Sequence, residues 1–160
     1  MGIRKRKVQA NYLKVGETFE LLGTGFTELN ESPSAQTTSK RYINQSSSSQ
    51  SVTGYEWNSS FNADQIASEK AIEHIRNIGE MQLTGADTET DYVIVDLDKE
   101  AQDGGYRARK FNIAIAVDSF DDNDGELGIS GNFLGQSEPI EGTFNTSTKS
   151  FTPGFTAKSE

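Results

Sequence analysis

Residues 111–134 read FNIAIAVDSFDDNDGELGISGNFL, and they set the fold class of this chain. On both sides of Asp124-Gly125, apolar side chains alternate with small or polar ones, which is the period of a β-strand. Asn/Asp-Gly pairs tolerate the positive φ angles that tight hairpins need. The stretch therefore predicts an antiparallel hairpin, 111–117 against 127–134, with one apolar face and one small, polar face.

Upstream of this hairpin the hydrophobic period changes from strands to a helix. Apolar residues at 66, 67, 71, 72, 75 and 78 share one side of a predicted helix, with a cap at Asn62 or Asp64 and a left-handed stop at Gly79. The remaining apolar-rich segments lie between turn residues and predict strands. These segments are residues 17–22, 26–30, 52–61, 81–83, 92–97, 106–117, 127–134 and 143–151.

Length and composition restrict the class of protein. The chain has 160 residues, which is about one domain, and only 33% of them are hydrophobic. The net charge of −9 argues against a protein whose main task is to hold nucleic acid. The sequence has no cysteine, which excludes disulfides, thiolate catalysis and cysteine metal sites. No apolar stretch approaches the length of a membrane-spanning helix, and no export signal is recognised.

Three segments read as extensions of this single domain, which spans 1–160. Residues 1–16 show no sustained period and are expected to be an N-terminal arm. Residues 33–51 are almost wholly polar, so we expect a long exposed loop in which Tyr42 and Ile43 are the apolar anchors. Residues 152–160 are expected to form a C-terminal tail.

Catalytic and binding motifs are not found. His74 is the one histidine and falls on the predicted helix, without a nucleophile motif elsewhere. If Gly125 held the sixth place of a calcium loop, Phe120 and Gly131 would stand at ligand positions, so that reading is rejected. The glycines at 23 and 25 lack the third glycine of a dinucleotide fingerprint. We expect no catalytic residue, no metal and no cofactor, and hence a protein that is not an enzyme.

The order of the elements resembles the major tail tube protein of long-tailed (siphovirus-type) bacteriophages. The resemblance covers residues 17–151 and rests on the segments Tyr55-Glu56-Trp57, Ser68-Glu69-Lys70-Ala71-Ile72-Glu73, Tyr106-Arg107-Ala108-Arg109-Lys110-Phe111, Asp124-Gly125-Glu126 and Ile129-Ser130-Gly131. It implies a mainly β fold: an antiparallel β-sandwich or barrel-like subunit with one flanking α-helix and a long polar loop between strands.

The same resemblance implies a structural virion protein. Hexameric rings would stack into a hollow tail tube, made in the bacterial host cytoplasm, through which DNA passes without adhering to an acidic wall. Its partners would be further copies of itself and the tape measure, tail terminator and distal tail proteins, with no membrane insertion.

Two surfaces of this chain follow as expectations from the resemblance. The ring-to-ring contact would use the loop residues Lys40, Arg41, Tyr42 and Ile43. The channel wall would be formed by polar residues of the sheet, namely Glu56, Asn58, Ser60, Asn112, Ser130 and Asn132.

Two alternatives remain open at this point. The first is a ring protein of a contractile injection or secretion system, which would have the same kind of fold. The two kinds of tube differ in whether a contractile sheath surrounds them. A small β-sandwich that binds a ligand is the second alternative, with Tyr55, Trp57 and Tyr106 as an exposed aromatic platform. An exposed Trp57 would favour this second alternative, and a buried Trp57 would oppose it.

Overall fold

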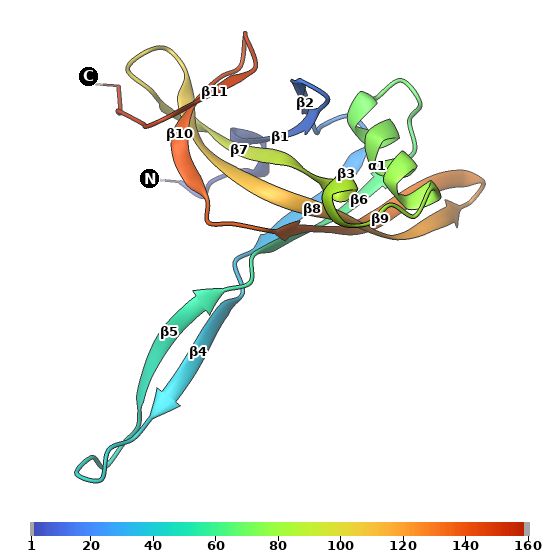
Figure 1. The fold of residues 1–160 in the computed structure, drawn as a ribbon. Coiled ribbons are helices and arrows are strands. Elements are labelled where there is room, and N and C mark those ends of the chain that lie inside the picture. Colours follow the sequence, from blue (N-terminus) through green and yellow to red (C-terminus); the bar gives the residue numbers. More distant parts are fainter. Residues whose placement is uncertain (1, 159–160) are drawn as a thin grey trace.

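A curled antiparallel β-sheet forms the body of the protein, and a separate β-hairpin projects from it (Figure 1). This computed structural model describes residues 2–158. The main sheet runs in the order β2-β1-β7-β8-β9-β6-β3, with β10 pairing with β8 and β11 with β10. The sheet curves into a half-barrel, with α1 on one side of it. The expected fold class, mainly β and barrel-like with a flanking helix, is confirmed.

The elements lie in the following order along the chain. Their bounds are η1 Arg6–Val8, β1 Gln9–Val15, β2 Thr18–Leu21, β3 Phe26–Ser32, β4 Ala35–Lys40, β5 Ser49–Tyr55, β6 Asn58–Asp64, α1 Lys70–Glu80, η2 Gly85–Thr88, β7 Glu89–Glu100, β8 Tyr106–Asn123, β9 Glu126–Gly135, β10 Ile140–Asn145 and β11 Ser150–Pro153.

The hairpin predicted from residues 111–134 is present as β8 and β9. Its register places Ile115 opposite Phe133 and Asn123 opposite Glu126. The turn residues Asp124 and Gly125 have φ angles of 55° and 90°, the positive values that the Asp-Gly pair predicts. The apolar side chains of β8 at 111, 113 and 115 are buried, as the alternation indicates.

The larger hydrophobic core lies between α1 and one face of the sheet. Its buried members on the helix are Ala71, Ile72, Ile75 and Ile78, as predicted. The helix begins at Lys70 rather than near the predicted caps. The reason is that β6 continues to Asp64, whose backbone N–H donates to the Gly25 carbonyl. Residues up to 64 are therefore held in the sheet.

Gly79 lies inside α1 and is not the predicted left-handed stop. A Cβ at this position would lie 2.8 Å from side-chain atoms of both Val117 and Phe120. Close packing of the helix against β8 therefore favours glycine here. The positive φ angle after the helix is taken by Gln82, at 51°. The segment 81–83, predicted as a strand, is part of this turn.

A smaller core lies on the opposite face of the sheet. It is formed by Tyr12, Val93, Val95, Ala108 and Phe144, with partly buried side chains around them. Strand β7 therefore lies between two cores, and both of its faces are buried at 92–95. This explains why its sequence is a continuous apolar run rather than an alternating one.

The prediction of an N-terminal arm over residues 1–16 is wrong for residues 9–15. They form β1, which pairs with β2 on one side and β7 on the other. Its successive residues Tyr12 and Leu13 enter the two different cores, and Asn11 is buried with its Nδ2 donating to the Tyr92 hydroxyl at 2.6 Å. Because both faces are covered, the strand has no period-2 signal to detect. Residue 1 lies outside the described residues.

The loop predicted for 33–51 is exposed but is not irregular. Strands β4 and β5 pair antiparallel there and form the projecting hairpin. Its residues lack an apolar period because both faces meet solvent rather than a core. The single strand predicted for 52–61 is accordingly two strands, interrupted at Glu56 and Trp57 where the hairpin joins the body.

The C-terminal segment also differs from its prediction. Residues predicted as one strand, 143–151, form parts of β10 and β11 with a turn between them. The tail predicted for 152–160 pairs with its own chain: β11 extends to Pro153, and Ala157 bridges to Ala101. The Lys158 backbone N–H donates to the Glu100 carbonyl at 3.1 Å. Residues 159–160 lie outside the described residues.

Candidate functional site

The hairpin tip brings together the four residues predicted to make a contact. Lys40 ends β4, and Arg41, Tyr42 and Ile43 follow it into the turn, all of them exposed. Tyr42 is 53% exposed and Ile43 fully exposed, at 108%. The Lys40 ammonium lies 5.0 Å from the centroid of the Tyr42 ring. The tip thus presents two cationic and two apolar side chains to solvent.

The base of the hairpin is held by a cluster around Glu31. The carboxylate of Glu31 accepts hydrogen bonds from Trp57 Nε1 at 2.6 Å and from both terminal nitrogens of Arg109 at 2.8 and 3.0 Å. The Trp57 ring stacks on Phe111, with 4.2 Å between centroids. The Arg109–Glu31 pair is bidentate, which restricts the geometry as well as adding energy. This cluster joins β3, β8 and the break before β6, where the hairpin leaves the body.

Five of the six predicted channel residues share one face of the sheet. In β6, β8 and β9, Asn58, Ser60, Asn112, Ser130 and Asn132 alternate with buried core residues, so they face away from α1. The register confirms that they share a face, because Ser60 lies opposite Asn132. We call these five residues the polar face. The sixth, Glu56, lies in the break between β5 and β6, beside the hairpin base, and is exposed.

Four carboxylates that were not predicted also lie on this side of the sheet. The register places Glu28 opposite Asn62, Asp64 opposite Gly128, and Glu89 and Asp91 opposite residues 114 and 112. These carboxylates therefore lie on the same side of the sheet as the polar face. No signal in the local sequence marks them, because the assignment depends on which strands pair and in which register.

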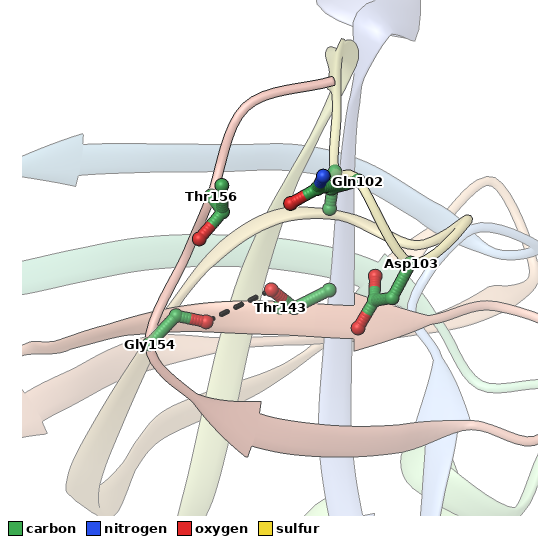
Figure 2. A pocket seen from close by; sticks show the side chains of 6 residues that line it. Gln102, Asp103, Thr143, Gly154 and Thr156 are labelled. Atoms are coloured by element: carbon green, nitrogen blue, oxygen red, sulfur yellow. Dashed lines mark hydrogen bonds between the residues drawn. The ribbon is translucent and has the colours of Figure 1, made fainter. Parts of the chain in front are cut away.

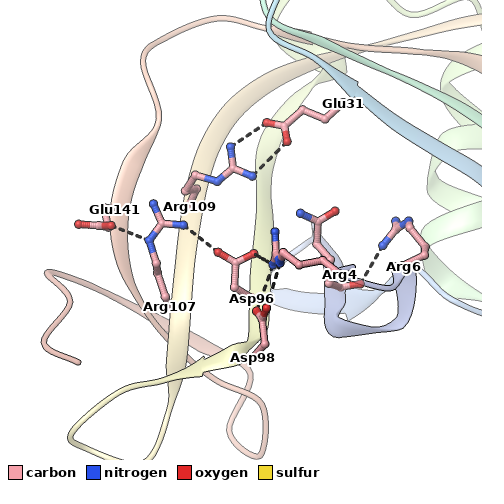
Figure 3. Close-up of polar contacts among 9 residues, drawn as sticks. Arg4, Arg6, Glu31, Asp96, Asp98, Arg107, Arg109 and Glu141 are labelled. Carbon is pink, nitrogen blue, oxygen red and sulfur yellow. Dashed lines mark hydrogen bonds and ion pairs between the residues drawn. The ribbon is translucent and has the colours of Figure 1, made fainter. Parts of the chain in front are cut away.

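A network of ion pairs fixes the N-terminal segment to the sheet (Figure 3). Asp96 is almost completely buried and lies between two arginines: Arg4 at 3.1 Å and Arg107 at 2.7 Å. Arg4 also bonds Asp98 at 2.9 Å, which holds the pKa of that carboxyl below its usual range. Arg107 reaches on to Glu141 at 2.6 Å. Arg4 therefore ties the segment before β1 to strand β7.

The pocket in Figure 2 lies between the β7–β8 turn and the C-terminal segment. Its volume is about 330 Å³, and it is lined by Ala101, Gln102, Asp103, Thr143, Gly154 and Thr156. The Thr143 hydroxyl donates to the Gly154 carbonyl at 2.9 Å, so it serves the backbone of β11. Asp103 is the one titratable side chain in this lining, which provides no pair of nucleophile and base.

The histidine and the acidic side chains of the described residues do not form a catalytic or metal site. His74 is half-buried on α1, and burial lowers its pKa. Within residues 2–158, no group of three or more acidic or histidine side chains is arranged to hold a metal ion. Over the same residues, no helix has the length and apolar character needed to cross a bilayer.

The aromatic platform considered for a ligand is not formed. Trp57 packs into the larger core and Tyr106 against the smaller one, on opposite faces of the sheet. Tyr55 stays on the hairpin, 66% exposed. Because the three rings do not share a surface, the structure opposes a β-sandwich that binds a ligand with them.

The fold is a curled sheet with a projecting hairpin, and a solved structure is similar to it. No protein-family model and no curated protein matches the sequence. A solved structure that is similar is a chain in the tail of an empty GTA particle, computed with helical refinement and C6 symmetry. The TM-score is 0.62 at 14% identity, over 86% of this chain and 97% of that chain. At this identity the likeness shows a shared fold.

Proposed function

We propose that this chain is the tube subunit of a long-tailed, siphovirus-type phage tail, in which hexameric rings stack into a hollow tube. The observation that carries the proposal is the fold shared with a tail chain of a C6-symmetric particle, at a TM-score of 0.62 over 97% of that chain. In this role the chain is structural and has no catalytic residue. It is made in the bacterial host cytoplasm and resides in the virion tail.

The proposed lumen is the side of the sheet opposite α1. It carries the polar face, Asn58, Ser60, Asn112, Ser130 and Asn132, and the carboxylates placed beside it by the register. Carboxylates repel DNA phosphates, and short neutral polar side chains offer no cation for a phosphate to bind. DNA therefore passes along such a wall without being retained. Glu56 lies at the end of this wall, at the hairpin base.

The proposed contact between rings is the hairpin tip. Lys40, Arg41, Tyr42 and Ile43 are exposed at the end of a hairpin that reaches beyond the body of the subunit (Figure 1). An isolated two-stranded hairpin is marginally stable in water, so a neighbouring copy would stabilise it. The tape measure, tail terminator and distal tail proteins are the further partners that this role requires.

The proposal is tested by imaging the purified protein with negative-stain electron microscopy over a concentration series, with sedimentation of the same samples. Hollow tubes with sixfold end views are the expected result. Compact monomers at every concentration, with no rings or tubes, would contradict the proposal.

A further inference from the structure

The tip of the β4–β5 hairpin and the β8–β9 turn carry charges of opposite sign. The hairpin has no acidic residue between 34 and 55 and carries Lys40 and Arg41 near its tip. The β8–β9 turn has no basic residue between 111 and 127 and carries a cluster of carboxylates. This acidic turn consists of Asp118, Asp121, Asp122, Asp124 and Glu126. The two turns therefore have opposite charge in a chain whose net charge is −9.

Neither set of charges is neutralised within the described chain. Among the ion pairs of residues 2–158, none involves the acidic turn, and none involves Lys40 or Arg41. The acidic turn makes only neutral contacts: Ser119 bonds Asp121, and the Gly125 N–H bonds Asp122. Several like charges at one turn repel one another, and a cationic partner relieves that repulsion.

The two turns lie at opposite ends of the same strand. Strand β6 begins at Asn58, next to the hairpin base, and ends at Asp64, which pairs with Gly128 beside the acidic turn. In Figure 1 the hairpin projects at the lower left and the β8–β9 turn lies at the far right. A second copy displaced along this direction would bring its acidic turn toward the hairpin of the first. Such a contact is head-to-tail and repeats in every copy.

Both turns also carry exposed apolar side chains that a contact can bury. Tyr42 and Ile43 lie at the hairpin tip, and Phe120 and Leu127 flank the acidic turn at 41% and 58% exposure. Protein interfaces commonly combine an apolar centre with a charged, solvent-accessible rim. The hairpin tip and the acidic turn therefore match in both charge and apolar character.

We propose that the acidic turn of one copy is the docking surface for the hairpin tip of the next copy. This inference rests on the proposed function, since it names the surface that receives the hairpin when rings stack. Lys40 and Arg41 would lie among the carboxylates, with Tyr42 and Ile43 against Phe120 and Leu127. The attraction between exposed charges is screened by salt, so assembly should weaken as ionic strength rises.

Charge reversal tests the pairing. The hairpin variant is Lys40→Glu with Arg41→Glu, and the turn variant is Asp118→Lys with Asp121→Lys; the latter leaves the Asp122 turn bond intact. Each variant alone should reduce pelleted tubes at least tenfold, and the chain with all four changes should recover to within about threefold of the original, because the pair is restored with its polarity reversed. A four-change chain that assembles no better than either variant would overturn the inference.

A matched control carries the same charge change elsewhere. Glu17→Lys with Asp87→Lys alters two exposed acidic residues outside both turns and should leave tube formation within about threefold of the original. Circular dichroism of each variant checks that the monomer is folded before assembly is compared.

Cross-linking tests the contact without altering its charges. The chain has no cysteine, so Ile43→Cys with Leu127→Cys introduces the only two thiols. A bifunctional maleimide should join copies of this variant into a ladder of multimers, whereas Ile43→Cys with Glu17→Cys should give far less. If the two cysteine variants gave equal ladders, the inference would be overturned. The proposed function would still stand, because it depends only on whether tubes form. If the unaltered chain forms no tubes, the proposed function itself fails.

Discussion

Trp57 Nε1 donates a 2.6 Å hydrogen bond to the carboxylate of Glu31, at the point where the hairpin leaves the sheet. The same carboxylate holds Arg109 through two bonds, so one side chain connects the two strands that enter the hairpin with β8. The base of the hairpin is therefore held to the body by side-chain contacts of Glu31.

Removing this carboxylate should loosen the hairpin base. Glu31→Ala leaves Trp57 Nε1 and a partly buried Arg109 without their acceptor, and we expect a loss of about 1–3 kcal/mol in the free energy of unfolding. Tryptophan emission should shift to the red as water reaches the indole. Urea unfolding measures the loss, with Glu28→Ala on the other face of β3 as control, expected within about 0.5 kcal/mol of the original. Equal effects of the two changes would contradict this role.

Asp96 and Asp98 share Arg4 but differ in burial, so their removal should differ in cost. Asp96→Ala removes a buried carboxylate that accepts from both Arg4 and Arg107, and we expect a loss of about 1–3 kcal/mol in the free energy of unfolding. Asp98→Ala removes an exposed pair and should cost much less than Asp96→Ala. Denaturant unfolding of both variants gives the comparison. An Asp98 variant as unstable as the Asp96 variant would refute it.

Gly131 is required by a close approach between strands. A Cβ there would collide with the Ala116 carbonyl oxygen in β8, so Gly131→Ala should destabilise the sheet by more than about 2 kcal/mol. Gly54 in β5 has open space around the same position, and Gly54→Ala should lie within about 0.5 kcal/mol of the original. Thermal unfolding distinguishes the two. A stable Gly131→Ala protein would show that this close approach is not required.

His74 should make stability depend on pH. Burial holds the pKa of its imidazole below the ordinary value of 6.5, so just below that pH the unfolded chain binds more protons than the folded chain. The free energy of unfolding should therefore fall as the pH decreases from 6.5 toward the folded-state pKa, and should be level above 6.5. Urea unfolding on either side of 6.5 measures this, and His74→Gln should flatten the profile. An unchanged slope in the variant would assign it to other groups.

Tyr42 should matter for assembly and not for folding. Its ring is 53% exposed and outside both cores, so Tyr42→Ala should leave the monomer's melting temperature unchanged. Loss of a large apolar anchor from an interface commonly costs more than about 1 kcal/mol of binding, and repeated contacts multiply that loss. Sedimentation should show fewer and shorter tubes. Tubes of normal length from a stable variant would contradict the role of the tip.

Local sequence was sufficient where one face of an element is buried and the other is not. The β8–β9 hairpin and the apolar side of α1 follow from periods of two and of 3.6 residues, and both are present. Sequence failed at β1, where both faces are buried, and at the β4–β5 hairpin, where neither is. In both cases the two faces share one environment, so no alternation marks the strand.

The surfaces were predictable to a lesser extent. Alternation within β6, β8 and β9 placed Asn58, Ser60, Asn112, Ser130 and Asn132 on one face, because each strand was recognised. Glu56 was predicted to lie within a single strand together with Asn58 and Ser60. It lies instead in the break between β5 and β6, which no local sequence signal marks. The Glu31 cluster joins residues up to 78 positions apart in the chain, and such contacts depend on the pairing of distant strands.

A cryo-electron microscopy reconstruction of the assembled protein would show which side of the sheet faces the lumen. We predict a hollow tube of stacked sixfold rings, with the polar face of β6, β8 and β9 lining the lumen and each hairpin seated on the next ring. A tube lined by the α1 side of the sheet, or an assembly without a lumen, would contradict this prediction.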